Sequence, residues 1–278
     1  MGPGANEGSG LDIRARGKFL SRLATAPGRS LPDYVMIGGM KCGTTSLFQY
    51  LQQHPGVSKV YVEEVHYFDL NYHRGLNWYR AHFPMMDKGD GRRISGDDSP
   101  YYIYHPLVPD RIKQDLPDVR LIALLRDPVD RAYSHYHHER RRGREDLSFE
   151  EALDKEGERL AGEEEQMRKD PGYVSMHHQR HSYVSRGRYA EQLRTWFDVF
   201  PKDRFLILQS EAMFHRPQAV LDRVLAFLDL PPMRLPDYDV FNPGSYPEMR
   251  PETHQMLSEH FAPHNEELFE LIGERFDW

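Results

Sequence analysis

The sequence predicts an α/β fold with a mostly parallel sheet, and three observations support this prediction. Residues 34–37 form a short apolar, β-branched run that passes through a glycine-containing loop into the helical pattern of residues 47–51. Residues 119–125 form the most apolar run in the chain, as expected of a central parallel strand that is covered on both faces. The length of 278 residues suits one large domain of this class.

The loop after the first predicted strand has the composition of an anion-binding site. Gly38 and Gly39 end the strand, and Lys41, Gly43 and the hydroxyl residues 44–46 precede the helix. The N–H groups of such a loop and the positive end of the helix dipole attract anions, and a lysine adds a full charge. An ordinary strand-to-helix turn does not account for a lysine and three consecutive hydroxyl side chains. The loop is not a Walker A motif, because Lys41 precedes Gly43.

Composition excludes several classes of protein. A formal net charge of −7 argues against general nucleic-acid binding. No apolar run approaches the roughly 20 residues that a membrane-spanning helix needs, and no signal peptide is visible. Cys42 is the only cysteine, so no intrachain disulfide can form, which is typical of a reducing compartment. We therefore expect a cytoplasmic protein.

The chain begins with a low-complexity segment, residues 1–10, followed by a basic amphipathic pattern over 11–26. The pattern predicts a surface helix packed on the domain, with contact to a membrane or partner as the alternative. We expect residues 1–30 to form a flexible N-terminal segment with a possible helix, and residues 31–278 to form a single domain.

The remaining elements follow from periodicity and from turn residues. The pattern predicts strands over 57–62, 92–96 and 204–209, helices over 106–116, 131–142, 189–200 and 217–228, and two terminal helices between 251 and 271 that Pro263 separates. Asp130 is expected to cap the helix over 131–142.

A group of ionisable residues follows the second predicted strand. Glu64, His66 and Phe68 would share one face if this segment is extended. A carboxylate and an imidazole would then point into the same space, as acid–base chemistry requires. The neighbouring aromatic residues are expected to desolvate Glu64 and raise its pKa. The alternative is a surface turn with solvated charges.

Three further groups contain candidate ligand-binding residues. Arg126 ends the central strand and Ser134 lies in the next helix, where doubly wound sheets bind ligands, although a structural ion pair is the alternative for Arg126. The arginines of residues 140–144 indicate a solvated helix face, or alternatively the edge of a site for an anionic acceptor. His177 and His181 are spaced i, i+4, but no carboxylate–histidine signature completes a zinc site, so we expect no metal.

Taken together, the chain from about Tyr34 to Trp278 resembles the sulfotransferases that use 3′-phosphoadenosine 5′-phosphosulfate (PAPS). The likeness is closest to bacterial carbohydrate-type members and to the domains that modify heparan sulfate. The motifs that carry it are Lys41-Cys42-Gly43-Thr44-Thr45-Ser46, Glu64-Val65-His66-Tyr67-Phe68-Asp69, Ser99-Pro100-x-Tyr102, Leu124-Leu125-Arg126-Asp127-Pro128 with Ser134, and the ending His264-Asn265 to Phe276-Asp277-Trp278.

The resemblance implies a P-loop-like three-layer α/β fold with a central, mostly parallel five-stranded sheet flanked by helices. It also implies transfer of the sulfuryl group from PAPS to a hydroxyl of a glycan, lipid or small metabolite, with 3′-phosphoadenosine 5′-phosphate (PAP) as product and no metal. The implied roles are the 5′-phosphosulfate site for Lys41, Cys42, Gly43, Thr44, Thr45 and Ser46, the 3′-phosphate site for Arg126 and Ser134, the general base for Glu64, and support of the acceptor or base for His66.

The chain departs from this family pattern at three places. Glu63 stands where many relatives have lysine, Asp98 stands where relatives with sulfated glycan acceptors have lysine, and residues 242–245 lack a clear counterpart of a late Lys-Gly-Arg loop. We expect carboxylates at Asp97 and Asp98 to disfavour polyanionic acceptors such as heparan sulfate by charge repulsion. Two alternative functions remain: a P-loop small-molecule kinase, and an inactive nucleotide-binding module.

Overall fold

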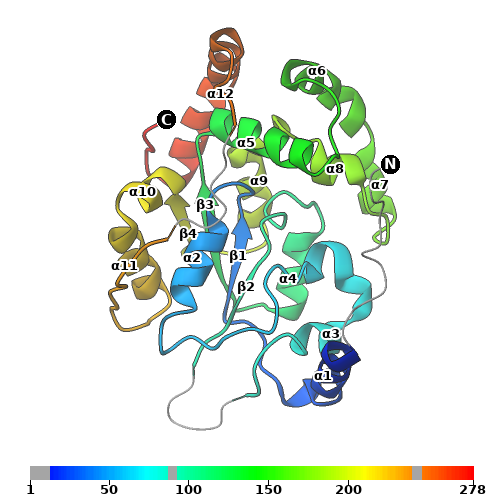
Figure 1. Cartoon of the computed structure of the whole chain (residues 1–278), viewed down its shortest axis with the longest axis vertical. Helices are drawn as coiled ribbons and strands as arrows, with labels where there is room; N and C mark the ends of the chain where they lie inside the picture. The colour runs from blue at the N-terminus through cyan, green and yellow to red at the C-terminus, as the bar shows by residue number, and fades with distance from the viewer. Residues whose placement is uncertain (1–12, 87–92, 240–245) are drawn as a thin grey trace, which may run out of the picture.

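A computed structural model describes residues 13–86, 93–239 and 246–278 (Figure 1). At its centre is a parallel sheet with the strand order β2-β1-β3-β4. The strands are β1 (Tyr34–Gly38), β2 (Gly96–Asp98), β3 (Arg120–Leu125) and β4 (Phe205–Gln209). The inner strands β1 and β3 are almost wholly buried, which explains why they coincide with two strongly apolar runs of the sequence.

Helices cover both faces of the sheet and make a three-layer arrangement (Figure 1). The helices are α1 (Ile13–Ala24), α2 (Thr44–Leu51), α3 (Leu76–Arg80), α4 (Val108–Asp115), α5 (Pro128–Arg141), α6 (Phe149–Leu160), α7 (Glu163–Lys169), α8 (Met176–Arg180), α9 (Tyr189–Phe197), α10 (Ser210–His215), α11 (Pro217–Phe227) and α12 (Pro251–Ile272). Of these, α2, α10 and α11 pack on one face of the sheet, and α4 and α9 pack on the other.

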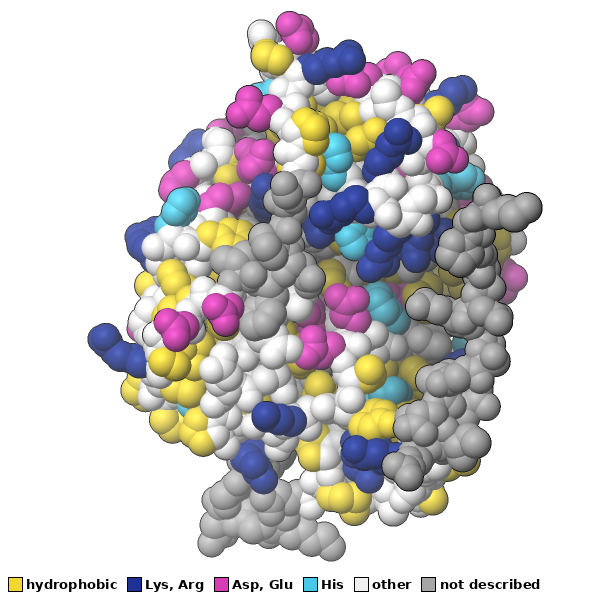
Figure 2. All heavy atoms as spheres, in the orientation of Figure 1, with side chains coloured by type: hydrophobic (Ala, Val, Ile, Leu, Met, Phe, Trp, Pro, Cys, Tyr) yellow, Lys and Arg dark blue, Asp and Glu magenta, His cyan; other side chains and the backbone are white. Residues whose placement is uncertain are grey.

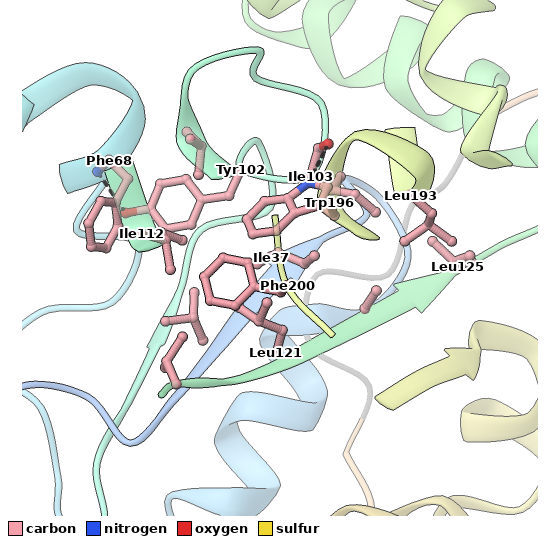
Figure 3. Packing of buried hydrophobic residues seen from close by; sticks show 14 of the residues in the cluster. Ile37, Phe68, Tyr102, Ile103, Ile112, Leu121, Leu125, Leu193, Trp196 and Phe200 are labelled. Carbon is pink, nitrogen blue, oxygen red and sulfur yellow. Dashed lines mark hydrogen bonds between the residues drawn. The ribbon is translucent and has the colours of Figure 1, made fainter. Parts of the chain in front are cut away.

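Alternate side chains of β1 point to opposite faces of the sheet. Val35 and Ile37 belong to the cluster formed with α4 and α9, whereas Tyr34 packs with α2 and α11. Trp196 of α9 is fully buried in the first cluster, and its indole N–H donates a hydrogen bond of 3.1 Å to the carbonyl of Ile103 (Figure 3). The packed faces leave the loops at the carboxyl ends of the strands available for a site.

The N-terminal helix α1 packs on the rest of the chain. Arg22 donates hydrogen bonds to the carbonyls of Ala81 (2.6 Å) and Phe83 (2.7 Å). The ring of Phe19 lies 6.0 Å from that of Tyr61 in a stacked arrangement. Across the described ranges, no helix combines the length and the apolar character that crossing a bilayer requires.

The sheet has four strands among the described residues, where the resemblance implies five. No strand covers the predicted range 57–62. Val57 makes a single parallel bridge with Ile94, and the N–H of Ser58 donates to the carbonyl of Ile94 (2.7 Å) before the chain leaves the sheet. The predicted strand over 92–96 is correspondingly displaced, because β2 begins only at the last of these residues.

Two predicted helix features are wrong. The C-terminal region contains one continuous helix, α12, with Pro263 inside it. Pro263 lies on the exposed side of α12, where the backbone carbonyl that loses its hydrogen bond can face solvent. Asp127, not Asp130, caps α5, because its carboxylate accepts the N–H groups of Val129 (2.8 Å) and Asp130 (3.0 Å).

Candidate active site

A cleft of about 580 Å³ opens at the carboxyl ends of β1 and β3. The loop after β1, the segment around Glu64 and His66, the inner side of α5, and residues of α8 and α10 all contribute to its lining. Ligands of open parallel sheets bind at this end of the strands. Of the residues proposed above for cofactor binding and catalysis, Lys41, Gly43, Thr44, Thr45, Glu64, His66, Arg126 and Ser134 line this one cleft.

The loop after β1 brings Lys41 and the N terminus of α2 into the cleft. Gly43 precedes α2 with a φ of 88°, a left-handed conformation that suits glycine, and an added Cβ would lie 2.6 Å from the side chain of Met213. Burial lowers the pKa of Lys41, and the charges of Arg141 and Arg126 lower it further. No carboxylate of the described residues pairs with Lys41. A cation and a helix N terminus therefore face the same space, as an anion site requires.

Cys42 and Ser46 lie in the same loop and helix, but their side chains do not line the cleft. Both are buried, and the carbonyl of Cys42 accepts a hydrogen bond of 2.7 Å from the hydroxyl of Ser210. Burial raises the pKa of the Cys42 thiol to about 11, so the thiol is protonated and poorly reactive at neutral pH. Any contribution of these two residues to ligand binding must come from their backbone.

One side of α5 faces the cleft with Asp130, Ser134 and His138, which are spaced one helical turn apart. Arg126, at the end of β3, donates to Asp130 over 3.0 Å. The ion pair that was the alternative for Arg126 therefore exists, yet the side chain still lines the cleft beside Ser134. A guanidinium and a hydroxyl at this position can bind a phosphate.

Glu64, His66 and Asp69 form a connected group on another wall of the cleft. The Nδ1 atom of His66 lies 2.7 Å from a carboxylate oxygen of the buried Asp69. Its Nε2 atom lies 3.7 Å from a carboxylate oxygen of Glu64. The imidazole is thus fixed by Asp69 and presented to Glu64, which is half exposed to the cleft.

The local backbone differs from the extended segment that the sequence predicts. Glu64 and His66 both adopt left-handed backbone conformations, with φ of 48° and 50°. Phe68 turns into the core instead of sharing their face. These conformations, not strand alternation, direct the carboxylate and the imidazole into the same space. Glu63 lies outside the cleft and accepts a hydrogen bond from the side chain of Gln49.

The charges in this group also differ from the expectation. Burial disfavours the imidazolium, but the hydrogen bond to Asp69 and the nearby carboxylate of Glu64 outweigh this cost and raise the pKa of His66 to about 10. The nearby imidazolium of His66 in turn lowers the pKa of Glu64, against the opposing effect of burial. The expected rise in the Glu64 pKa is therefore wrong, because a cation stands beside the carboxylate. At neutral pH the pair is a carboxylate and an imidazolium.

Asp97 and Asp98 do not face an acceptor, contrary to the expectation that they repel polyanions. Both side chains are buried in β2. Asp97 accepts hydrogen bonds from the hydroxyl groups of Tyr79 (2.9 Å) and Tyr102 (3.0 Å). Burial raises the pKa of Asp98 well above its usual range, and Glu64 and Asp97 add to the shift. These carboxylates belong to the interior, because parallel strands are covered on both faces.

The arginine run of residues 140–144 supplies much of the positive charge of the cleft. Three of these side chains line the cleft, namely Arg141, Arg142 and Arg144. This position is compatible with the alternative interpretation of the run, the edge of a site for an anion. Figure 2 shows Lys and Arg side chains gathered with His on this face of the molecule, near α5 and α8. The sequence signal for a ligand-facing role was present, but charge composition cannot say which way a helix faces.

Two residues had no site signal in the sequence: Arg186, which lines the cleft, and Asp69, which lies behind His66. Arg186 is buried, stacks over the rings of Tyr101 and Tyr104, and donates to the carbonyl of His178 (3.0 Å). In the sequence, Asp69 was only one letter of a family motif. In the structure its carboxylate contacts Nδ1 of His66 and fixes the imidazole. Both depend on contacts between segments or on local backbone turns that no periodicity reveals.

The remaining candidates lie elsewhere. His177 and His181 contact each other through their Nδ1 atoms at 2.9 Å, and within the described part of the chain no group of three or more potential ligands could hold a metal ion. The late loop, residues 242–245, lies outside the described residues.

Comparison with known proteins agrees with this geometry. The family model for the sulfotransferase domain matches residues 31–258. The fold superposes on a sulfotransferase from Alicyclobacillus acidocaldarius with a TM-score of 0.71 and 30% identity, covering 89% of this chain and 98% of that one. The chain therefore belongs to the family of PAPS-dependent sulfotransferases.

Sequence relatives place it near the enzymes of heparan sulfate modification. It is 27% identical to the membrane-associated sulfotransferase kil1 of Dictyostelium discoideum, over 89% of this chain and 66% of that protein. It is 29% identical to heparan sulfate glucosamine 3-O-sulfotransferase 3B1 of Mus musculus, over 93% and 67% of the two chains. The chain thus spans about two thirds of the length of these two relatives.

Proposed function

We propose that this protein transfers the sulfuryl group of PAPS to an acceptor hydroxyl, with Glu64 as the general base. The observation that carries the proposal is the placement of Glu64 and His66, with His66 held by the buried Asp69, in the same cleft as Lys41 and the N terminus of α2. One wall supplies a base, and the other supplies a cation and N–H donors. Transfer between two oxygens requires both.

The donor groups of the cleft suit the anionic parts of PAPS. Lys41 and the backbone N–H groups at the start of α2 would hold the 5′-phosphosulfate. Arg126 and Ser134 would hold the 3′-phosphate, because they lie together on the α5 side of the cleft. Their hydrogen-bonding capacity is of the kind that phosphate oxygens accept.

The reaction then follows from the charges. The acceptor oxygen bonds to sulfur while the bond between sulfur and the bridging oxygen breaks, and PAP leaves with that electron pair. The hydroxyl proton passes to Glu64. Lys41 stabilises the charge that develops on the bridging oxygen. His66 and Asp69 hold the Glu64 carboxylate ionised and oriented.

The direct test compares Glu64→Gln with Glu63→Gln, a neighbouring carboxylate outside the cleft. Labelled PAPS and a panel of glycan, lipid and small hydroxyl acceptors would be used, with products read by mass spectrometry. We expect Glu64→Gln to lose about 10²–10⁴-fold in turnover with normal PAP affinity, and Glu63→Gln to be nearly normal. The reverse result would transfer the role to Glu63. Failure of the wild-type protein to bind PAP, together with Mg²⁺-dependent ATP turnover, would favour a kinase instead.

Two expectations from the sequence accompany this proposal. Residues 31–278 are proposed to act as one sulfotransferase domain, which expression without residues 1–30 would test through retained PAP binding. The cytoplasm is the proposed location, supported by the single cysteine and tested by cell fractionation. Recovery of the protein in a membrane fraction, as the name of the Dictyostelium relative suggests for that protein, would contradict it.

A further inference from the structure

The cleft holds more positive charge than the proposed PAPS site uses. Seven Lys and Arg side chains line it, against four carboxylates. Lys41 and Arg126 are assigned to PAPS, and Asp130 already pairs with Arg126 at 3.0 Å. The carboxylate of Glu211 accepts the N–H of Asp127 (2.9 Å) and the indole N–H of the C-terminal tryptophan (3.0 Å), so it neutralises no arginine directly.

The surplus charge lies on the α5–α8 side of the cleft. Burial raises the pKa of the Glu139 carboxyl, and the charges of four arginines of the cleft oppose this rise, namely Arg144, Arg142, Arg180 and Arg186. The Nη1 atom of Arg144 lies 3.7 Å from a carboxylate oxygen of Glu139. Four guanidinium groups therefore act on one carboxylate.

Two of these arginines have unused hydrogen-bonding capacity. Among the described residues, the side chains of Arg142 and Arg180 make no hydrogen bond or ion pair, and the Nε atom of Arg180 is buried without a partner. Both belong to the lining of the cleft. Burial lowers the pKa of Arg180, and repulsion from Arg144 and Arg142 lowers it further. A bound oxyanion would relieve this repulsion and satisfy the free N–H groups.

The position of Arg142 relates this charge to the reaction. Arg142 is close enough to lower the pKa of both Lys41 and Glu64. Arg142 also lines the same cleft as Lys41 and Glu64, so its charge acts on both groups that the proposed reaction uses. An anion bound there would be part of the acceptor, because the PAPS phosphates are assigned to the first loop and to the Arg126 side.

We propose that Arg142 and Arg180 bind an oxyanion of the acceptor, so that the natural acceptor is an anionic hydroxyl compound bearing a carboxylate or sulfate group near the hydroxyl that is modified. This inference rests on the proposed function. The recognising charge comes from the end of α5 and from α8, not from β2, where Asp98 is buried.

The test uses PAP-saturated protein, so that the cofactor site is filled before any other anion is added. Calorimetry would first measure PAP affinity, and then titrate inorganic sulfate, glucuronate and, as the neutral probe, glucose. The variant is Arg142→Gln/Arg180→Gln, whose side chains make no hydrogen bonds that folding would lose. The control is Arg223→Gln, an arginine outside the cleft that pairs with Glu274.

We expect saturable binding of sulfate, glucuronate or both, and none of glucose. The double variant should weaken anion binding about tenfold or more, as the loss of charged hydrogen bonds implies, and Arg223→Gln should not. PAP affinity should change by less than about threefold, because the phosphates of PAP are assigned to Lys41, the start of α2, Arg126 and Ser134 and not to these two arginines. Binding of neither anion, or unchanged anion binding in the double variant, would overturn the inference. An equal loss of PAP affinity would assign the arginines to the cofactor. Absence of PAP binding in the wild-type protein would instead reject the proposed function.

Discussion

Replacing His66 tests whether a cation beside Glu64 sets the pH range of catalysis. His66→Gln removes the imidazolium 3.7 Å from the Glu64 carboxylate and keeps a polar side chain of similar length. The imidazolium of His66 lowers the pKa of Glu64, so the variant should raise that pKa toward its ordinary value. Because the base must be ionised, the acid limb of the kcat profile should move to higher pH.

The magnitude follows from the distance and the exposure. Two unit charges about 4 Å apart interact by about 1 kcal/mol in water, and Glu64 is half exposed, so the value for water applies rather than a buried one. Since about 1.4 kcal/mol corresponds to one pKa unit, the acid limb should rise by about half to one unit.

The assay is kcat against pH at saturating PAPS and acceptor, with folding checked by circular dichroism at each pH. Asp69→Asn is the matched control, because it changes the contact of Asp69 with the imidazole but keeps His66. A histidine with the ordinary pKa of about 6.5 is still protonated at the low pH of the acid limb, so the cation beside Glu64 remains. Its acid limb should stay in place. An unmoved acid limb in His66→Gln, or one that moves to lower pH, would refute the reasoning.

Two further predictions concern the cofactor site and the buried carboxylates. Arg126→Ala should weaken PAP binding by about 10–100-fold through the loss of charged hydrogen bonds, yet hardly affect adenosine 5′-phosphosulfate, which lacks the 3′-phosphate; equal losses in calorimetry would reject the assignment. Asp98→Asn should raise the melting temperature at about pH 8 and have a smaller effect as pH falls toward the unfolded carboxyl pKa of about 4, because the raised pKa of Asp98 makes its ionisation costly in the folded state. A lower melting temperature at pH 8 would show that the carboxylate is stabilising.

Local sequence was sufficient for the central strands and for the phosphate loop. The pattern from Tyr34 into α2 contains its own strand, glycine turn and helix start, so the anion site could be predicted from about a dozen neighbouring residues. The apolar run of β3 likewise predicted a central strand. The same reasoning placed Arg126 and Ser134 at the carboxyl end of the sheet, because parallel topology makes that edge common to all strands.

Tertiary structure decided which side chains reach the cleft and in which charge state. Cys42 and Ser46 belong to the family motif, but their side chains are buried and do not line the cleft. Arg142 and Arg180 come from separate segments of the chain, and only the fold brings both into the lining of the cleft. Glu64 has a lowered pKa because left-handed turns bring His66 beside it. Burial and charge pairing depend on neighbours that are distant in the chain or on backbone turns without a periodic signal, so a sequence pattern that fixes strands and loops leaves these properties open.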